Sequence, residues 1–383
     1  MENKYSKELV KDCVNKIMKL SDDSWNDLIQ KYNLDISQDH LRKMSYGMKV
    51  AYDLLMEESS NEEQLLELKK EKVKLSDLRT EANKQIRNLA RVENMTELLK
   101  ENIDALGKVK PIVSNDYIFL DTNYDNVNHA ILLASDWHYG LEIDNHLNKF
   151  NTDICVQRVN KLIEKTIKHC KTQNVKCLHL FFLGDLISGN IRNIIRLQNR
   201  IDVSSQIVQV SELIVEMIAK LSYEIPYVTI SFCLGNHERS IDKKENCLET
   251  DTYLPLIKSL VQLRTKELKN VVVIDNEYGD WVIVRNILGH KFVGTHGNYV
   301  KKEKANYQLS NIIKIDVDYV CLGHFHNNMN LTEYETQTFI NGSLCGSDNY
   351  SKSLMLHTFP SQKLLMVNED EGVFAEFVLK IEG

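Results

Sequence analysis

Five short clusters of polar residues each follow an apolar run in the sequence, and their side chains are of the kinds that bind metal ions. The clusters are Asp136-Trp137-His138, Gly184-Asp185, Gly235-Asn236-His237-Glu238, Thr295-His296-Gly297 and Gly323-His324-Phe325-His326. Carboxylate, imidazole and amide-oxygen ligands together suit first-row divalent ions such as Mn, Fe or Zn better than Ca or Mg alone. The ligands are numerous enough for two ions. Two cations ~4 Å apart can clamp a phosphate ester and acidify a water between them.

The spacing within the clusters favours one shared centre. In Asp136-x-His138 and His324-x-His326, an extended backbone would aim both side chains to the same side. Glycines beside four of the clusters allow close turns and leave room for ions and substrate. A single motif of this kind is an ordinary turn or a surface feature. Five in order, each after a predicted strand, indicate ligands that meet at one edge of a sheet.

The elements that must position these clusters alternate between strand-like and helix-like segments. The predicted strands are residues 130–135, 177–183, 227–234, 271–275, 281–285, 291–295 and 317–322, and the predicted helices are 153–171, 204–221 and 254–268. From Gln337 to Leu379 the sequence is again rich in strand-forming residues. This alternation predicts an α/β layered sandwich, in which helices cover one sheet or two.

Residues 1–57 predict a small helical region. Ser24 and Asp27 form a capping-box pattern that opens a short helix ending near Lys31, and Ser37 is the predicted N-cap of a second helix running towards Glu57. Two such helices are compatible with a helix-turn-helix. The second helix would carry the basic residues His40, Arg42, Lys43 and Lys49. An ordinary helical hairpin with solvated charges explains the same pattern, and both interpretations stay open.

Residues 58–110 predict a long helix or coiled coil, and residues 111–128 a linker. Apolar positions recur in steps of three and four. The seam runs through Leu75, Leu78, Ala82, Gln85, Leu89, Val92, Thr96, Leu99, Ile103 and Leu106. It could fold back on the next domain or pair two chains, and we expect a homodimer. Gln85 and Thr96 would lower the stability of that pairing and help to fix its register.

Composition excludes a globally basic nucleic-acid binder, because the net charge is -7 and the pI is near 6.0. A local basic groove stays compatible with this charge. The eight cysteines include no Cys-x-x-Cys pair, and several lie inside apolar runs, as is typical of a reducing cytosol. The sequence begins without an apolar signal core and has no stretch of ~20 apolar residues, so we expect a soluble cytoplasmic protein with no membrane partner.

The five clusters resemble the signature of the calcineurin-like metallophosphoesterase superfamily. That signature reads D-x-H, G-D, G-N-H-(D or E), H and G-H-x-H in this order, and all five blocks occur between about residues 130 and 330. The resemblance implies a four-layer αββα sandwich over residues 129–383, preceded by an all-helical N-terminal region. It also implies two divalent metal ions bridged by one aspartate, with Mn expected and Fe, Zn or Mg as alternatives.

Site residues follow from the same resemblance, block by block. The implied ligands of the first ion are Asp136, His138, Asp185 and His326, and those of the second are Asp185, Asn236, His296 and His324. His237 would face the substrate without binding metal and would protonate the leaving oxygen as a general acid. Glu238 would either orient His237 or point away. Arg239 would pair with a phosphate oxygen, unless it is a solvated loop arginine.

A finer resemblance points to one branch of the superfamily. The Asp-Arg-Gly expected of Ser/Thr phosphatases does not follow Gly184-Asp185. Four features look similar to DNA-repair exonucleases of phage and prophage type: residues 184–191, Gln206 in a predicted helix, residues 235–239 and residues 341–344. Their setting would be the cytoplasm of a bacterium or of a phage-infected host. Arg192, Arg196 and Arg200, four apart, could form one basic helical face beside the metals, and salt bridges on an ordinary helix surface explain the same spacing.

Together these patterns predict a binuclear metal-dependent phosphoesterase that hydrolyses phosphodiester bonds, with DNA as its partner and a DNA nuclease as the first choice. Two alternatives stay open. One is a phosphatase or phosphodiesterase for a small nucleotide or a phosphoprotein. The other is a non-catalytic adaptor that binds DNA, although a scaffold has no physical need for seven polar ligands converging on one spot.

Overall fold

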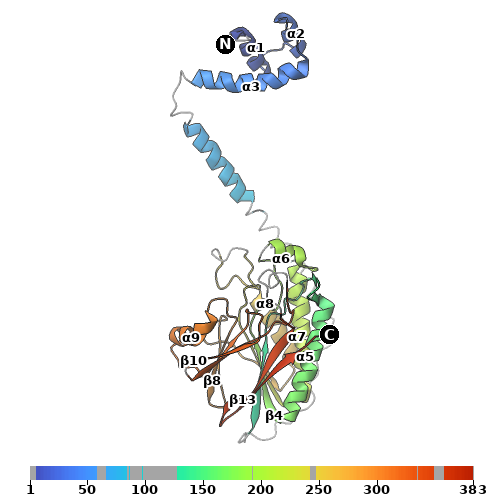
Figure 1. Ribbon diagram of the computed structural model, residues 1–383, viewed down its shortest axis with the longest axis vertical. Helices are drawn as coiled ribbons and strands as arrows, with labels where there is room; N and C mark the ends of the chain where they lie inside the picture. Colours follow the sequence, from blue (N-terminus) through green and yellow to red (C-terminus); the bar gives the residue numbers. More distant parts are fainter. Residues whose placement is uncertain are drawn as a thin grey trace. The chain divides into compact units, whose positions relative to one another are not determined.

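The computed structural model describes residues 6–57, 66–83, 86, 97, 127–191, 193–241, 247–333, 335–348 and 358–382. The chain divides into two compact units, Met1–Val92 and Glu93–Gly383 (Figure 1). In the described part of the chain, none of the helices is both long enough and apolar enough to span a bilayer.

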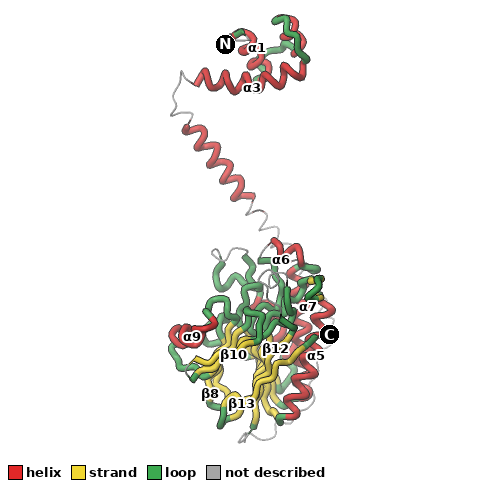
Figure 2. The backbone as a smooth tube through the Cα atoms, viewed as in Figure 1, coloured by secondary structure: helices red, strands yellow, loops and turns green. Residues whose placement is uncertain are grey.

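The first unit contains three short helices around a small core, drawn in red in Figure 2. They are α1 (Lys7–Ile17), α2 (Trp25–Lys31) and α3 (Gln38–Glu57). The capping box that opens α2 is confirmed, because Ser24 Oγ accepts from Asp27 N at 3.2 Å and Asp27 Oδ2 accepts from Ser24 N at 2.7 Å. Helix α1 was not predicted. The buried members of the core are Leu9, Cys13, Leu28 and Leu41.

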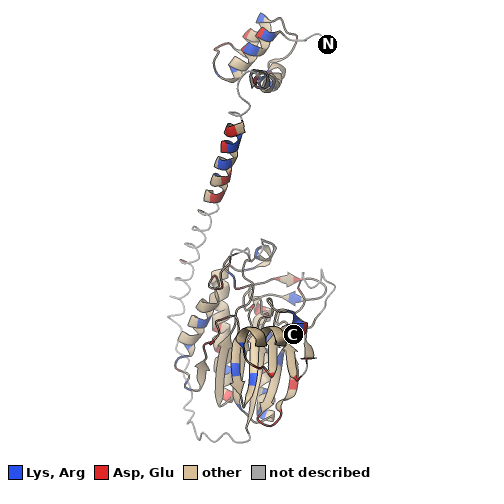
Figure 3. Cartoon of the chain, turned by 90° about the vertical axis from the view of Figure 1, so that its left-hand side faces the viewer, with Lys and Arg blue, Asp and Glu red and all other residues tan. Residues whose placement is uncertain are grey.

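Residues 66–83 form a helix whose side chains are all exposed. Charges of both signs cover it (Figure 3), and Leu75 and Leu78 of the predicted seam are each 66% exposed. From Gln85 onward the members of the seam lie outside the described residues. Pairing through this helix therefore stays a prediction.

The second unit contains two main sheets, of orders β13-β12-β1-β4-β5-β6 and β10-β11-β9-β8-β7. The strands of the first sheet are β1 (Asn128–Ala134), β4 (Val175–Phe182), β5 (Tyr227–Phe232), β6 (Val271–Val273), β12 (Ser361–Asn368) and β13 (Gly372–Lys380). Those of the second are β7 (Ile283–Ile287), β8 (His290–Thr295), β9 (Tyr319–Leu322), β10 (Met329–Glu333) and β11 (Thr336–Ile340). A short hairpin joins β2 (Ile143–Asp144) to β3 (Lys149–Phe150).

Side chains of the first sheet alternate between two cores. In β1, Leu132 and Ala134 pack with the large helices, whereas Ile131 and Leu133 pack against the second sheet. The helices on the first face are α5 (Thr152–Thr172), α7 (Val203–Glu224) and α8 (Leu254–Thr265). The short α6 (Asn193–Gln198) precedes α7. The first sheet therefore lies between the helices and the second sheet, and both of its faces are apolar.

A fourth layer covers the outer face of the second sheet. Helix α9 (Ala305–Ile313) buries Ala305, Leu309 and Ile313 against Val293 and Val320 of that sheet. The layers are thus helices, sheet, sheet and helix, which confirms the αββα sandwich. Helix α9 and strand β10 were not predicted.

Strand direction brings the loops together. β1, β4 and β5 are parallel, and β8 is parallel to β9. Because parallel strands end at the same edge, the loops that follow them gather at one end of the strands, drawn in green in Figure 2. This edge is where the polar clusters of the sequence lie.

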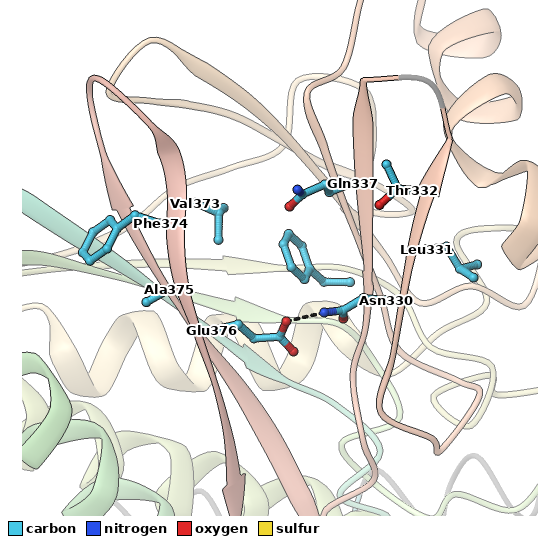
Figure 4. Close-up of a pocket in the computed structure, with 9 residues that line it drawn as sticks. Asn330, Leu331, Thr332, Gln337, Val373, Phe374, Ala375 and Glu376 are labelled. Carbon is cyan, nitrogen blue, oxygen red and sulfur yellow. Dashed lines mark hydrogen bonds between the residues drawn. The ribbon is translucent and has the colours of Figure 1, made fainter.

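A cavity of about 230 Å³ lies between the sheet edges formed by β10, β11 and β13 (Figure 4). Beside it, the buried Lys363 ammonium donates to Glu376, to Asn330 Oδ1 and, at 3.3 Å, to the Met329 carbonyl. A buried charge is tolerated when it is paired in this way. None of the predicted metal ligands lines this cavity, so it is separate from the candidate site.

Candidate metal centre

All seven predicted ligands lie at the carboxyl ends of strands. Asp136 and His138 follow β1, Asp185 follows β4, and Asn236 follows β5. The ligands from the second sheet are His296 after β8, and His324 and His326 after β9. The loops at one edge of the sandwich therefore carry the whole predicted set.

The extended backbone predicted for Asp136-x-His138 and His324-x-His326 is wrong. Five of the seven ligands have positive φ, between 46° and 67°. They are Asp136, His138, Asp185, His324 and His326. Residues other than glycine rarely adopt this left-handed conformation, and strain of this kind is concentrated at functional sites. Tight turns, and not strand periodicity, aim these side chains inward.

One group of ligands joins β1 to β9. His326 Nε2 lies 3.2 Å from Asp136 Oδ1 and 3.3 Å from His138 Nε2. The Asp136 carboxylate also accepts from the backbone N–H of His324 at 3.1 Å and 3.2 Å. His326 thus lies next to both a carboxylate and an imidazole, and a group of close potential ligand atoms contains His138, His326 and the buried Cys345.

A second group joins β4, β5, β8 and β9. His296 Nε2 lies 3.2 Å from Asp185 Oδ2, 3.1 Å from Asn236 Oδ1 and 3.2 Å from His324 Nδ1. His296 Nδ1 donates to the Leu183 carbonyl at 2.8 Å, which fixes the tautomer and leaves Nε2 facing the other ligands.

Asp185 belongs to both sides of the centre. Its carboxylate lies within 4.8 Å of the ring nitrogens of His138 and His237, and within the same distance of those of His296 and His324. A carboxylate has two oxygens and can bind two cations at once. The side chains also fit a metal ion. The buried Nδ1 of His138 has no hydrogen-bond partner among the described residues, and its Nε2 lies 3.3 Å from His326 Nε2. Two facing imidazole nitrogens are a favourable arrangement for binding a cation.

Two glycines allow the turns around Asp185 to approach each other. A Cβ on Gly184, whose φ is +81°, would lie 2.5 Å from the backbone of Gly235. A Cβ on Gly235 would lie 2.1 Å from the backbone N of Asp185. Larger residues at either position would separate the β4 and β5 turns and with them their ligands.

Glu238 does not orient His237. Its carboxylate accepts from the backbone N–H of Asp185 at 3.1 Å and from that of Leu186 at 2.6 Å. Burial, together with the nearby Asp185 charge, raises the pKa of Glu238 to about 7. Sequence reasoning missed this role, in which Glu238 fixes the turn that carries Asp185.

His237 is held by two other contacts. Its Nδ1 donates to the Ser188 carbonyl at 2.7 Å, and its backbone N–H donates to Asp185 Oδ1 at 2.8 Å. Its Nε2 lies 3.9 Å from Asp185 Oδ2, which is too far for a hydrogen bond, so this nitrogen can bond to a substrate atom. The ring is fixed at the centre while its side chain stays 16% exposed.

Supporting contacts to the β1 turn come from the segment after β11 and from strand β12. Asn341 Nδ2 donates to Ser135 Oγ at 2.9 Å, and Ser343 Oγ donates to the Asp136 carbonyl at 3.0 Å. Gln362 Oε1 accepts from Ser135 N at 2.8 Å. These contacts fix the β1 turn from residues more than 200 positions away in sequence. The Asn341-Gly342-Ser343 stretch was the only sequence signal for them.

Electrostatics favour the ionised carboxylates. Burial acts to raise the pKa of Asp136, but His326 outweighs it and the pKa falls to about 2. For Asp185, burial is outweighed by His296 and His237, and the pKa lies well below its usual range.

The histidines divide according to their neighbours. Burial lowers the pKa of His138 to about 3 and that of His324 to about 4, so both are neutral and can bind cations. Burial would lower the pKa of His296 as well, but Asp185 raises it to about 9. The site thus attracts positive charge next to Asp185.

The predicted basic helical face is wrong. Helix α6 ends at Gln198, so Arg200 lies beyond it, and Arg200 Nη1 is 3.2 Å from Glu142 Oε1. Arg192 lies outside the described residues. Arg239 is partly buried, and its Nε has no hydrogen-bond partner among the described residues. Its contact with a phosphate stays a prediction.

The sequence profile of the calcineurin-like phosphoesterase family matches residues 129–328, which include every ligand described above. The chain belongs to this family. Family members hydrolyse phosphoesters and typically bind divalent metal ions, so the ligand groups of this calcineurin-like phosphoesterase match the family's chemistry.

One curated relative is the SPbeta prophage-derived uncharacterized protein YonJ of Bacillus subtilis (strain 168), 26% identical over 336 residues that cover 84% of this chain and 81% of that protein. Solved structures are more distant. A novel archaeal phosphodiesterase is 15% identical over 65% of this chain and 99% of its own, with a TM-score of 0.33. Zinc-complexed Vps29 from Entamoeba histolytica is 12% identical over 66% and 99%, with a TM-score of 0.31.

Proposed function

We propose that this calcineurin-like phosphoesterase is a two-metal nuclease that cleaves phosphodiester bonds of DNA. The observation that carries the two-metal part is the position of Asp185, whose carboxylate belongs to ligand groups on both sides of it. Asp185 is 1% exposed. A buried carboxylate needs compensating positive charge, which His296 supplies here and which two cations would supply when bound.

Each ligand has a part in this proposal. Asp136, His138, Asp185 and His326 would hold one cation, and Asp185, Asn236, His296 and His324 the other. When bound, two divalent cations, Mn in our proposal, would neutralise the phosphoryl oxygens and acidify the attacking water. The backbone N–H groups that hold the Asp136 and Asp185 carboxylates orient these two ligands before any cation arrives.

His237 supplies the proton for the leaving oxygen. Its Nδ1 donates to a backbone carbonyl, which only accepts, so Nε2 is the position from which a proton can be delivered. Arg239, two residues further along this loop, would bind a phosphate oxygen through its guanidinium group, whose buried Nε has no hydrogen-bond partner among the described residues.

DNA as the substrate is supported by the resemblance to exonucleases and by the first unit. Helix α3 exposes His40, Arg42 and Lys43, and we propose that it contacts the DNA backbone. We also propose that the seam beginning at Leu75 pairs two chains, because an isolated helix gains little stability without a partner face. Removing residues 1–128 should then weaken binding of long DNA and leave hydrolysis of a small diester. A full-length chain that stays monomeric by light scattering at tens of micromolar would contradict the dimer.

The decisive assay for substrate class uses pure protein with Mn. Labelled single- and double-stranded DNA, bis-p-nitrophenyl phosphate, a small nucleotide and a phosphoprotein are compared under the same conditions. Cleavage of DNA that disappears in Asp185→Asn supports the nuclease. Hydrolysis of the small ester or phosphoprotein without cleavage of DNA would instead establish the alternative phosphoesterase. If none of these substrates is hydrolysed, the non-catalytic DNA-binding adaptor is the alternative that is supported.

A further inference from the structure

The chain leaves the metal centre after His296 through residues 297–304, here called the exit segment. Gly297 has a φ of +112°, and a Cβ there would lie 3.0 Å from Phe325 Cε2. Phe325 stands between the ligands His324 and His326, and its ring lies 5.5 Å from the His324 ring. The exit segment therefore begins at the centre and packs on a residue that separates two ligands.

The backbone of the exit segment is held by its own hydrogen bonds. Val300 N donates to the Gly297 carbonyl at 3.2 Å, and Lys304 N donates to the Lys301 carbonyl at 2.8 Å. Lys301 N donates to Gln308 Oε1 of α9 at 2.9 Å. Residues Lys302–Lys304 form a 3-10 helix. The side chains of this segment thus project from a defined surface beside the metals.

The exit segment carries more lysines than acidic residues and one aromatic residue, Tyr299, although the chain as a whole has a net charge of -7. Its charged residues are Lys301, Lys302, Glu303 and Lys304. Lys302 Nζ lies 3.9 Å from Glu303 Oε1, and the following helix, α9, contains no charged residue, so the three lysines of the segment outnumber its one carboxylate. Tyr299 is 66% exposed, and Lys302 Nζ lies 5.9 Å from the centroid of the Phe325 ring.

We propose that the exit segment is the track on which a single-stranded stretch of nucleic acid leaves the metal centre. This inference rests on the proposed nuclease function. Tyr299 stacks on a base, and the three lysines pair with successive backbone phosphates. Positive surfaces that carry exposed aromatic rings bind single strands without regard to sequence, because every base has a face on which a ring can stack. A small ester held at the metals has no second phosphate to reach these lysines.

The test compares two substrates in each variant. kcat/KM for Mn-dependent cleavage of a labelled single-stranded oligonucleotide is divided by kcat/KM for bis-p-nitrophenyl phosphate. The variant Lys301→Gln/Lys302→Gln/Lys304→Gln is matched with Lys168→Gln/Lys266→Gln/Lys291→Gln. The control lysines are exposed and lie towards the amino ends of β4, β6 and β8, away from the ligand edge.

We expect the ratio to fall at least about tenfold in the exit-segment variant and to stay at the wild-type value in the control. The salt dependence of oligonucleotide binding should become shallower by about 2 in log–log slope, from ~0.7 for each single-strand phosphate contact. Tyr299→Ala should lower the ratio about tenfold, and Tyr299→Phe should restore it, because stacking needs the ring and not the hydroxyl.

Equal ratios in the exit-segment variant and its control would overturn the inference and leave the nuclease intact. Loss of phosphoprotein hydrolysis with normal oligonucleotide cleavage would overturn it as well. A wild-type protein that hydrolyses the small diester but cleaves no nucleic acid would refute the proposed function itself, and the strand track with it.

Discussion

Histidines occur within strands β1 and β4 and also in the loops that follow β1, β5, β8 and β9, and the two sets behave differently. Within the strands, His129 Nδ1 lies 3.0 Å from His179 Nε2, and His179 Nδ1 lies 2.7 Å from Thr229 Oγ1. Burial lowers the pKa of His129 to about 4 and that of His179 to about 3. This internal pair is a row of neutral hydrogen-bonded groups on one face of the sheet.

Beyond the strands, left-handed turns add carboxylates to the histidines. Among the described residues, the potential metal ligand that lies with the internal pair is the thiol of Cys177, and burial raises the pKa of that thiol to about 12, so it stays protonated. At the strand ends, Asp136 and Asp185 are ionised and face imidazole nitrogens. Histidines beside buried, ionised carboxylates are therefore better candidates for a metal site than histidines beside a protonated thiol.

The largest effect expected from this contrast is for Asp185→Asn. The change removes the charge that belongs to both ligand groups while it keeps the size of the side chain. Hydrolysis should fall below detection and bound metal should decrease in elemental analysis. Wild-type metal content together with wild-type turnover would end the assignment of Asp185 as the bridging ligand.

His237→Gln should have the next largest effect, and on rate alone. We expect hydrolysis to slow by ~10²–10⁴, the usual contribution of a general acid, with both metals retained. The loss should shrink for esters with good leaving groups, which need no proton. If the variant instead loses a full metal equivalent, His237 is a ligand.

Glu238→Ala should weaken metal binding about 10–100-fold, because the turn that carries Asp185 loses both of its carboxylate acceptors. Glu238→Gln keeps one acceptor oxygen and should lie between Ala and wild type. Metal titration followed by calorimetry measures this order. Equal metal affinities in the wild type and both variants would show that the Glu238 contacts are not needed to position Asp185 for metal binding.

The smallest effect concerns the internal histidine pair. Both pKa values are lower in the folded protein than the ordinary value of 6.5, so the unfolded chain binds more protons below that value. The contribution of the two histidines to the free energy of unfolding should be fully present above pH 6.5. It should decrease as the pH falls from 6.5 towards 4. Arg285 faces this pair from β7 and adds to the cost of protonation.

The matched variant is His129→Gln/His179→Gln. Its unfolding free energy, from denaturant titrations, should depend less on pH between 6.5 and 4 than that of the wild type. Its metal content should equal that of the wild type, because no ligand of the centre has changed. A lost metal equivalent would make the internal pair a second metal site and remove the contrast drawn above.

Alternating apolar runs and polar clusters are local signals, so the sequence pattern alone allowed an α/β layered sandwich with polar clusters at one sheet edge to be predicted. The four-layer αββα order and the assignment of seven ligands came from the resemblance to the calcineurin-like family. Helix α9 was missed because it has no charged residue to mark a solvent face. The role of Glu238 could not be seen, since its partners are backbone N–H groups of another turn, brought close by folding. The left-handed backbone of Asp136 and His138 was likewise hidden, because non-glycine residues rarely adopt it.

The most direct test of the two-metal centre is titration of metal-free wild-type protein with Mn while hydrolysis of bis-p-nitrophenyl phosphate is followed. Asp185 as a shared ligand predicts two equivalents bound per chain, with full activity only after the second equivalent. Saturation of both binding and activity at a single equivalent would contradict a centre in which Asp185 joins two ions.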